Sequence, residues 1–197
     1  EQLQAIADEL AGKAEVHCVV ADLQTRLGLT QTIEILRQKG PVDYLINNAG
    51  YSTMGNFSEI DLEPQQGMVD LHITATMALT RAAIPFMKER GGGAVINVSS
   101  LASFAAIGGV SVYCASKAFL NSFSECLQLE VAADNIRVQS LCPGYTYSEF
   151  HDRDAMSAFD RDWVPEEQWQ TAAAVVAESL AALGGEKVVI ATGLSAW

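Results

Sequence analysis

Short apolar segments alternate with segments of helical periodicity along most of the chain, and this alternation limits the possible folds most. The expected strands, rich in β-branched residues, cover residues 15–23, 42–50, 94–100, 135–144 and 186–193. Helices are expected at residues 1–12, 24–38, 63–89, 112–132 and 165–182. Strands that are apolar on both faces and separated by helices are typical of a parallel sheet with helices on both sides. The sequence therefore predicts a doubly wound α/β fold.

The chain has 197 residues, enough for one domain with a sizeable core, and it contains neither internal repeats nor a linker. The opening helix places Leu3, Ile6 and Leu10 on one face and is expected to stop at Gly12. No residue before this helix begins a domain, and the chain has no initiator methionine. We therefore expect a single domain over residues 1–197 that is incomplete at its N-terminus.

Composition and charge favour a small-molecule ligand over a polymer or a membrane. Hydrophobic residues make up 49% of the chain and charged residues 18%, which is typical of a folded globular domain. The net charge of −12 argues against nucleic acid, because Lys and Arg drive binding to phosphates. The charge also disfavours an anionic membrane surface, and no apolar run approaches the roughly 20 residues that cross a bilayer.

The four cysteines are widely spaced, and three of them lie in apolar segments, where a thiol usually packs as a small hydrophobic group. The three histidines show no metal-ligand spacing with them, so we expect no metal site. There is no signal peptide pattern. Together these features favour a reducing, cytoplasmic location.

Polar or conformationally permissive residues stand at the carboxyl ends of four expected strands, which are the ends where ligands bind in sheets of this class. They are Asp22, Asn47 to Gly50, Ser99 with Ser100, and Pro143 with Gly144. Each has a structural alternative as a helix cap, a turn or a helix-blocking segment. A purely structural role for all four strand ends together is less expected than such a role for any one of them. The pattern therefore favours one shared ligand-binding cleft.

Tyr113 and Lys117 are one helical turn apart, so their side chains project from the same face. Taken alone, a Tyr-x-x-x-Lys spacing often arises by accident. Here Ser100 ends the preceding strand, and the loop after it is long enough to bring Ser100, Tyr113 and Lys117 together. A tyrosine titrates near ~10, and a neighbouring ammonium is expected to lower that pKa. A serine hydroxyl can hold a substrate carbonyl oxygen against the phenol. The trio predicts proton transfer coupled to hydride transfer, and the hydride requires a cofactor.

These ordered features resemble the short-chain dehydrogenase/reductase family, and the resemblance covers residues 1 to about 193. It rests on Asp22, Asn47–Asn48–Ala49–Gly50, Ser100, Tyr113-x-x-x-Lys117 and Pro143–Gly144. The resemblance implies a Rossmann-type sheet and an NAD(P)(H)-dependent oxidoreductase that interconverts a carbonyl and a secondary alcohol. It implies that Tyr113 is the acid/base, that Lys117 binds the nicotinamide ribose and tunes Tyr113, and that Ser100 orients the substrate.

The same resemblance distributes the cofactor-binding residues along the strand ends. Asp22 and Leu23 would lie near the adenine, and the adenosine side would be lined by Asn48, Ala49 and Gly50. Tyr113 and Lys117 would contact the nicotinamide ribose. The nicotinamide would lie beside Pro143, Gly144 and Thr146.

The chain departs from the family at its N-terminal side, because no glycine-rich turn follows a strand. Gly91–Gly93 precedes a strand, which is the wrong order for a phosphate cradle. The family's first βαβ unit is missing with that turn, and this leaves a gap in the expected sheet. Whether this chain alone binds cofactor, and whether the cofactor is NAD or NADP, stays open.

Two further positions differ from the family. His72 occupies the place of an asparagine that supports a proton relay to the lysine, with its register given by Pro85. We weigh a retained relay role for His72 equally against a histidine tolerated in a helix distortion. Ser148 stands where threonine is more frequent, and it keeps the hydroxyl.

The expected substrate is an apolar ketone or alcohol, because the predicted pocket wall is apolar and aromatic. Its residues are Met54, Phe57, Phe104, Tyr145 and Phe150. The irregular stretch 145–164 is expected to form a lid or an ordinary surface loop. The alternatives are a non-catalytic truncated domain that acts as a binding or scaffold protein, and a dehydratase or epimerase that uses the same pair. Apolar residues on the helices at 63–89 and 112–132 suggest a homodimer or homotetramer, as is common in the family.

Overall fold

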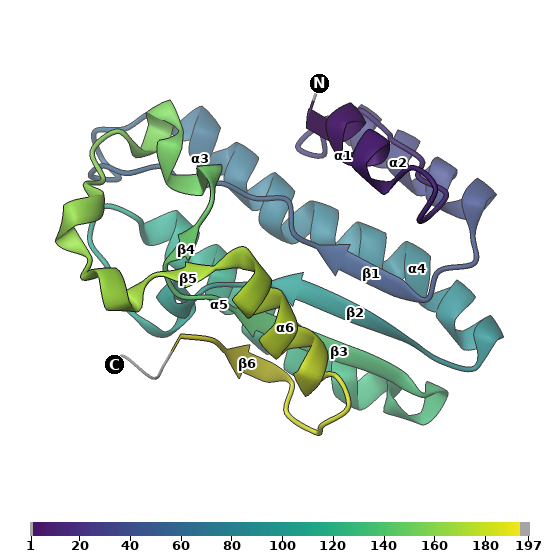
Figure 1. Ribbon diagram of the computed structural model, residues 1–197. Helices are drawn as coiled ribbons and strands as arrows, with labels where there is room; N and C mark the ends of the chain where they lie inside the picture. Colours follow the sequence, from purple (N-terminus) through teal and green to yellow (C-terminus); the bar gives the residue numbers. More distant parts are fainter. Residues whose placement is uncertain (1, 194–197) are drawn as a thin grey trace.

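The computed structural model describes residues 2–193, which fold around a four-stranded parallel sheet (Figure 1). The strands lie in the order β1 (Tyr44–Asn47), β2 (Gly93–Val98), β3 (Ile136–Cys142) and β6 (Val189–Ala191). Neighbouring strands are paired in parallel register, as in Asn47 opposite Asn97 and Asn97 opposite Ser140. The doubly wound α/β fold predicted from the sequence is confirmed, with each strand shorter than its apolar segment.

The helices follow the expected periodic segments. They are α1 (Gln2–Leu10), α2 (Arg26–Lys39), α3 (Leu62–Val69), α4 (Thr76–Arg90), α5 (Ser111–Val131) and α6 (Ala172–Ala182). The helix expected at 63–89 is divided, because a π-helical turn at Asp70–Ala75 separates α3 from α4. At its end α4 stops at Gly91, whose left-handed backbone accommodates the chain reversal before β2.

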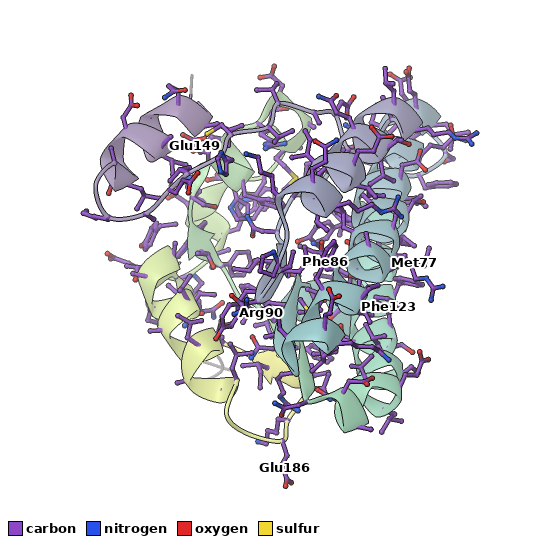
Figure 2. The ribbon with its side chains drawn as sticks, turned by 90° about the vertical axis from the view of Figure 1, so that its right-hand side faces the viewer. Met77, Phe86, Arg90, Phe123, Glu149 and Glu186 are labelled. Carbon is purple, nitrogen blue, oxygen red and sulfur yellow. The ribbon has the colours of Figure 1, made fainter. Side chains whose placement is uncertain are left out.

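The helices cover the sheet on both faces, with α4 and α5 on one side and α6 on the other (Figures 1 and 2). Successive strand residues point to opposite faces. Val95 and Val138 therefore pack with Met87 of α4 and Leu127 of α5, in a core that also includes Ala83, Val131 and Ile136. On the other face, Ile96 and Leu141 pack with Val175 of α6. These two clusters hold the sheet rigid beneath its carboxyl edge.

The expected strand at residues 15–23 does not form. This segment runs in extended or irregular conformation, and Val20 is 85% exposed. A strand needs a hydrogen-bonding neighbour, and β1 pairs with β2 on one side while no strand of the described residues lies on its other side. Tyr44 and Ile46 of β1 are accordingly 62% and 58% exposed.

Residues 145–171 form a segment that lies at the carboxyl ends of the strands (Figure 1). Its two short strands, β4 (Thr146–Tyr147) and β5 (Gln170–Thr171), pair with each other, and 3₁₀ turns occupy much of the chain between them. The helix expected at 165–182 therefore begins later, at Ala172, where the Thr171 hydroxyl accepts a hydrogen bond from Ala174 N. Among the described residues, no helix is both long and apolar enough to span a membrane.

Candidate active site

Of the four predicted strand ends, those of β2 and β3 lie together, because backbone hydrogen bonds join the segments that follow them. The end at Asp22 is not a strand end, because residues 15–23 form no strand. The amide of Ser99 donates to the Leu141 carbonyl, and the amide of Leu101 donates to the Pro143 carbonyl at 2.9 Å. The Ser100 turn and the Pro143–Gly144 turn are thus side by side at the carboxyl edge of the sheet. An added Cβ at Gly144 would lie 3.2 Å from Cδ1 of Leu101, so the two turns are in close contact.

Helix α5 places Tyr113 and Lys117 over this edge. Two bonds from the Lys117 residue tie the helix to β2 and the residue after it. The Lys117 ammonium donates to the Val98 carbonyl at 2.8 Å, and the Ser99 hydroxyl donates to the Lys117 carbonyl at 2.8 Å. Lys117 is 5% exposed, and burial lowers its pKa to about 8. Lys117 is therefore an interior residue, which argues against an accidental Tyr-x-x-x-Lys spacing on an exposed helix face.

The side chain of Ser100 is a hydrogen-bonding neighbour of the Tyr113 hydroxyl and acts to lower its pKa. The Ser100 Oγ accepts from the Ala102 amide at 3.1 Å. Ser100, Tyr113 and Lys117 are thus brought together, as the sequence predicted. The three side chains come from two elements, the turn after β2 and the first turns of α5.

The pKa of Tyr113 differs from the prediction. Burial raises it to about 12, and the bond from Ser100 acts in the opposite direction without overcoming burial. Lys117 lies over the Tyr113 ring, with its Nζ 5.6 Å from the ring centroid, and directs a proton to a backbone carbonyl. The predicted lowering of the Tyr113 pKa is wrong for this structure, because desolvation outweighs the opposing effect of Ser100.

His72 lies in the π-helical turn and is 1% exposed. Its Nε2 accepts from the Tyr51 amide at 3.2 Å, and its Nδ1 lies 2.8 Å from the Ser116 Oγ. Because the Ser116 hydroxyl donates to the Tyr113 carbonyl, the bonding pattern assigns the proton to Nδ1 of His72. Burial, followed by the charge of Lys117, lowers the pKa of His72 to about 3. His72 is therefore neutral and uses both ring nitrogens to join α5 to the loop after Gly50.

The residues predicted for the adenosine side lie at the open margin of the sheet. Asn48, Ala49 and Asp22 are exposed, and Leu23 is half-buried. The Asp22 carboxylate accepts from the Gln24 amide at 3.0 Å, so it closes a local turn before α2. The structure places these residues on two adjoining segments, apart from the Ser100–Tyr113–Lys117 cluster.

Gly50 connects that margin to the cluster. An added Cβ at Gly50 would lie 2.8 Å from His72 Nε2 and 3.5 Å from Lys117 Nζ. Thr146, predicted beside the nicotinamide, is half-buried and donates from its hydroxyl to the Gly144 carbonyl at 3.0 Å. The cluster is therefore bordered by the loop at Gly50 and by the Pro143–Thr146 turn.

An aromatic group within residues 145–169 borders the cluster through Phe150. The Phe150 ring lies 5.8 Å from the Tyr113 ring, and the Met54 amide donates to the Ala155 carbonyl across the same opening. Further ring contacts join Tyr145, His151, Phe159, Trp163 and Trp169. Met54, Tyr145 and Phe150 of the predicted wall belong to this region. Phe57 and Phe104 are 58% and 61% exposed, and Phe57 lines a separate surface cavity with Leu62 and Val69.

Two sets of residues near the cluster were not predicted from the sequence. Ser103 and Asn121 form a buried link behind Ser100, and Tyr51 bonds through its hydroxyl to the Pro64 carbonyl at 2.7 Å. Polar residues within the apolar face of the helix at 112–132 were a signal for the first set. Tyr51 directly follows the Asn-Ala-Gly segment, which is a signal for the second.

The structure holds no group of three or more His, Cys, Asp or Glu side chains arranged for a metal within residues 2–193. The four cysteines are free thiols. Cys114 and Cys142 are buried, whereas Cys18 and Cys126 are exposed, so the apolar context of the sequence overstated the burial of cysteines.

Comparisons with known proteins agree with this geometry. The model of the short chain dehydrogenase family matches residues 1–157. A 3alpha-hydroxysteroid dehydrogenase of Mediterraneibacter gnavus is 35% identical over 142 residues, which are 72% of this chain and 57% of that protein. The chain likewise spans little more than half the length of several other curated relatives that it matches.

Solved structures share the fold over nearly the whole chain. A short-chain dehydrogenase from Sphingobium yanoikuyae in complex with NADPH is 30% identical with a TM-score of 0.87, covering 96% of this chain and 73% of that chain. A bulky-bulky ketone specific alcohol dehydrogenase from Comamonas testosteroni is 26% identical with a TM-score of 0.81, covering 96% and 71%. The chain belongs to the short-chain dehydrogenase family.

Proposed function

We propose that this protein catalyses NAD(P)(H)-dependent interconversion of a carbonyl compound and a secondary alcohol, with Tyr113 as the acid/base. The observation that carries the proposal is the buried Lys117 ammonium, which lies 5.6 Å from the centroid of the Tyr113 ring and is held by the Val98 carbonyl at the end of β2, with Ser100 as a neighbour of the Tyr113 hydroxyl. A phenol, a hydroxyl and an ammonium at the carboxyl edge of a parallel sheet are the groups that carbonyl reduction needs.

In the reduction direction, Tyr113 donates a proton to the developing alkoxide while Ser100 donates a hydrogen bond to the same oxygen. A raised pKa keeps Tyr113 protonated at neutral pH, so the proton is present before the reaction begins. An alkoxide is a much stronger base than a phenolate, so transfer from the phenol to it is favourable. In oxidation the roles reverse, and Tyr113 must first lose its proton.

Lys117 stabilises the phenolate that forms when Tyr113 gives up its proton. Its ammonium is buried beside the ring, where charges interact more strongly than in water. With three N–H donors, the ammonium can serve the Val98 carbonyl and still reach a ribose hydroxyl. His72 fixes the neighbouring loop and α5 through its two ring nitrogens. We therefore propose that His72 supports catalysis by holding α5 and the loop after Gly50 in position.

The residues present fit the two nucleoside ends of a dinucleotide. Tyr113, Lys117 and Thr146 offer hydroxyl and ammonium groups that suit ribose and carboxamide, beside Pro143 and Gly144. Gly50 has no room for a side chain, because an added Cβ would lie 2.8 Å from His72 Nε2, and its backbone lies beside Lys117. The exposed margin of Asp22, Leu23, Asn48 and Ala49 suits adenosine. When bound, NAD(P)(H) supplies or accepts the hydride.

Among the described residues, no glycine-rich turn between a strand and a helix is present to cradle the pyrophosphate. The chain also spans little more than half the length of several curated relatives, so nucleotide binding by this chain is the first step of the proposal to test. NADPH is named with one related structure. A titration with NADH and with NADPH decides which nucleotide this chain accepts.

The proposed substrate is a hydrophobic ketone or secondary alcohol. Phe150 packs on Tyr113, and Tyr145 and Met54 lie in the same apolar surroundings. Two relatives are named for a hydroxysteroid and for bulky ketones, which supports a substrate of this class. We further propose a cytoplasmic homodimer or homotetramer, supported by free cysteines and by exposed Met77 on α4 and Leu129 on α5.

The test titrates NADH and NADPH while following nicotinamide fluorescence, and then measures turnover of a panel of ketones with product analysis. Binding and alcohol formation in the wild type, with turnover lowered at least a hundredfold in Tyr113→Phe, are expected. No binding of either nucleotide overturns the proposal in favour of a non-catalytic binding or scaffold domain. Dehydrated or epimerised products would instead assign a dehydratase or an epimerase.

A further inference from the structure

A buried hydrogen-bond network runs from the end of β3 through α5 to the turn that carries Ser100. Asn121 on α5 is 9% exposed, and its Oδ1 accepts from the Ser140 hydroxyl at 2.7 Å and the Cys142 thiol at 3.3 Å. Its Nδ2 donates to the Ser103 Oγ at 2.8 Å. The Ser103 hydroxyl in turn donates to the Ser100 carbonyl at 2.6 Å. Each proton in this chain of bonds has a definite direction.

The directions follow from the donors available. The Ser100 carbonyl can only accept, so the Ser103 hydroxyl gives its proton there and must itself accept from the Asn121 nitrogen. The Asn121 oxygen then faces Ser140 and Cys142. At the buried end of the network, formed by Asn121, Ser140 and Cys142, every member is satisfied, so a rotation of the Asn121 amide leaves a buried group unpaired.

The network acts on the residue that contacts Tyr113. Its last bond fixes the Ser100 carbonyl, while the Ala102 amide fixes the Ser100 Oγ from the other side at 3.1 Å. We propose that Asn121 and Ser103 are positioning residues, which hold the Ser100 turn so that the Ser100 hydroxyl bonds the Tyr113 phenol. This inference rests on the proposed function for its catalytic consequence, but the positioning itself can be measured without turnover.

Gln128 provides a matched control on the same helix and strand. It lies seven residues after Asn121, and its Oε1 accepts from the Val138 amide at 2.8 Å. Its Nε2 donates to the Ile136 carbonyl at 3.1 Å. Gln128 therefore ties α5 to the beginning of β3, whereas Asn121 ties α5 to the end of β3 and to the Ser100 turn. Loss of either side chain removes bonds between the same two elements.

The experiment labels tyrosine with ¹³C at Cζ and follows the Tyr113 resonance, which Tyr113→Phe identifies. Ser100→Ala gives the reference position for a phenol that has lost its serine partner. We expect Asn121→Ala and Ser103→Ala to move the resonance toward that reference, and Ser103→Thr, which keeps the hydroxyl, to restore it. Gln128→Ala is expected to leave it at the wild-type position. Ser103 is half-buried and lines an open cavity, so its variants should fold even if Asn121→Ala does not.

Kinetics then test the consequence. Turnover of a ketone is expected to fall roughly tenfold or more in Ser103→Ala with little change in KM, because small displacements of a catalytic group are costly. The proposal is overturned if Ser103→Ala leaves the Tyr113 resonance unmoved, or if Gln128→Ala moves it equally. A wild-type chain that reduces no ketone refutes the proposed function alone, since the resonance comparison still decides the positioning.

Discussion

The Lys117 ammonium lies 5.6 Å from the centroid of the Tyr113 ring and donates a 2.8 Å hydrogen bond to the Val98 carbonyl. A cation over an aromatic face within about 6 Å is attracted by the ring. These two contacts only partly offset the loss of water around a charge that is 5% exposed. The remaining cost appears as the lowered pKa of Lys117, about 8 against an ordinary value of 10.5.

The first prediction concerns stability and pH. Above pH 8 the folded chain releases the Lys117 proton, while the unfolded chain keeps it up to pH 10.5. Because the unfolded state then binds more protons, stability rises with pH in this window. Between about pH 7 and about pH 9.5, the wild type should gain about 2 kcal/mol relative to Lys117→Met. Urea unfolding at both pH values measures the gain. A constant difference between the two proteins contradicts a buried, titrating Lys117.

The second prediction concerns His72 in acid. The folded chain resists protonating His72 until about pH 3, whereas the unfolded imidazole binds a proton near pH 6.5. Stability is therefore lost as pH falls through this window. From about pH 7.5 to about pH 5 the loss due to His72 should be about 2 kcal/mol. His72→Asn removes this part of the slope, and urea unfolding at the two pH values detects it.

Turnover of His72→Asn separates the two roles weighed for this position. A neutral His72 with both ring nitrogens engaged is expected to act through the position of its neighbours. The variant should then change the turnover number without moving the pH profile of turnover. A shifted pH profile would assign His72 to the proton relay and contradict the supporting role.

The carboxyl edge of the sheet was predictable because its signals are local. Ser100 lies at the end of a segment rich in β-branched residues, which is typical of a strand. Tyr113 and Lys117 are one turn apart in a helical segment, so their side chains project from the same face. Parallel strands then bring the ends together by topology alone. The boundaries, by contrast, depended on tertiary partners. Residues 15–23 have strand-like composition, but a strand also requires a hydrogen-bonding neighbour, which composition does not supply.

The energetics of the cluster were less predictable than its membership. The pKa of Tyr113 is raised mainly by desolvation, and the burial of a side chain cannot be judged from the spacing of residues in the sequence. The link from Asn121 through Ser103 to Ser100 joins residues that are distant in sequence, so no motif signals it. The contact of Phe150 with Tyr113 likewise arises from the path of an irregular segment.

The third prediction concerns substrate size. The Phe150 ring lies 5.8 Å from the Tyr113 ring and occupies space over the phenol. Phe150→Ala should raise kcat/KM for bulky ketones relative to a small ketone by about tenfold, because the space freed admits a larger group. Phe57→Ala is the control, since Phe57 is 58% exposed and lines a different cavity. An unchanged ratio in Phe150→Ala contradicts a substrate site beneath this ring.

The fourth prediction concerns Gly50. An alanine Cβ there would lie 2.8 Å from His72 Nε2 and 3.5 Å from Lys117 Nζ. His72 would have to shift, and its bond to the Tyr51 amide would weaken. Gly50→Ala should therefore lower the free energy of unfolding by about 1–3 kcal/mol. It should also reduce nucleotide binding, because the same Cβ stands beside Lys117.

Gly108 is the matched control for this change. No heavy atom lies within 4 Å of a Cβ added at Gly108, and its backbone is outside the left-handed region. Gly108→Ala should leave stability within about 0.5 kcal/mol of the wild type or raise it slightly, since alanine restricts the unfolded chain. Urea unfolding and a nicotinamide fluorescence titration of both variants make the comparison. If Gly50→Ala behaves like Gly108→Ala in both measurements, the close contact of the Gly50 loop with His72 and Lys117 is absent in solution.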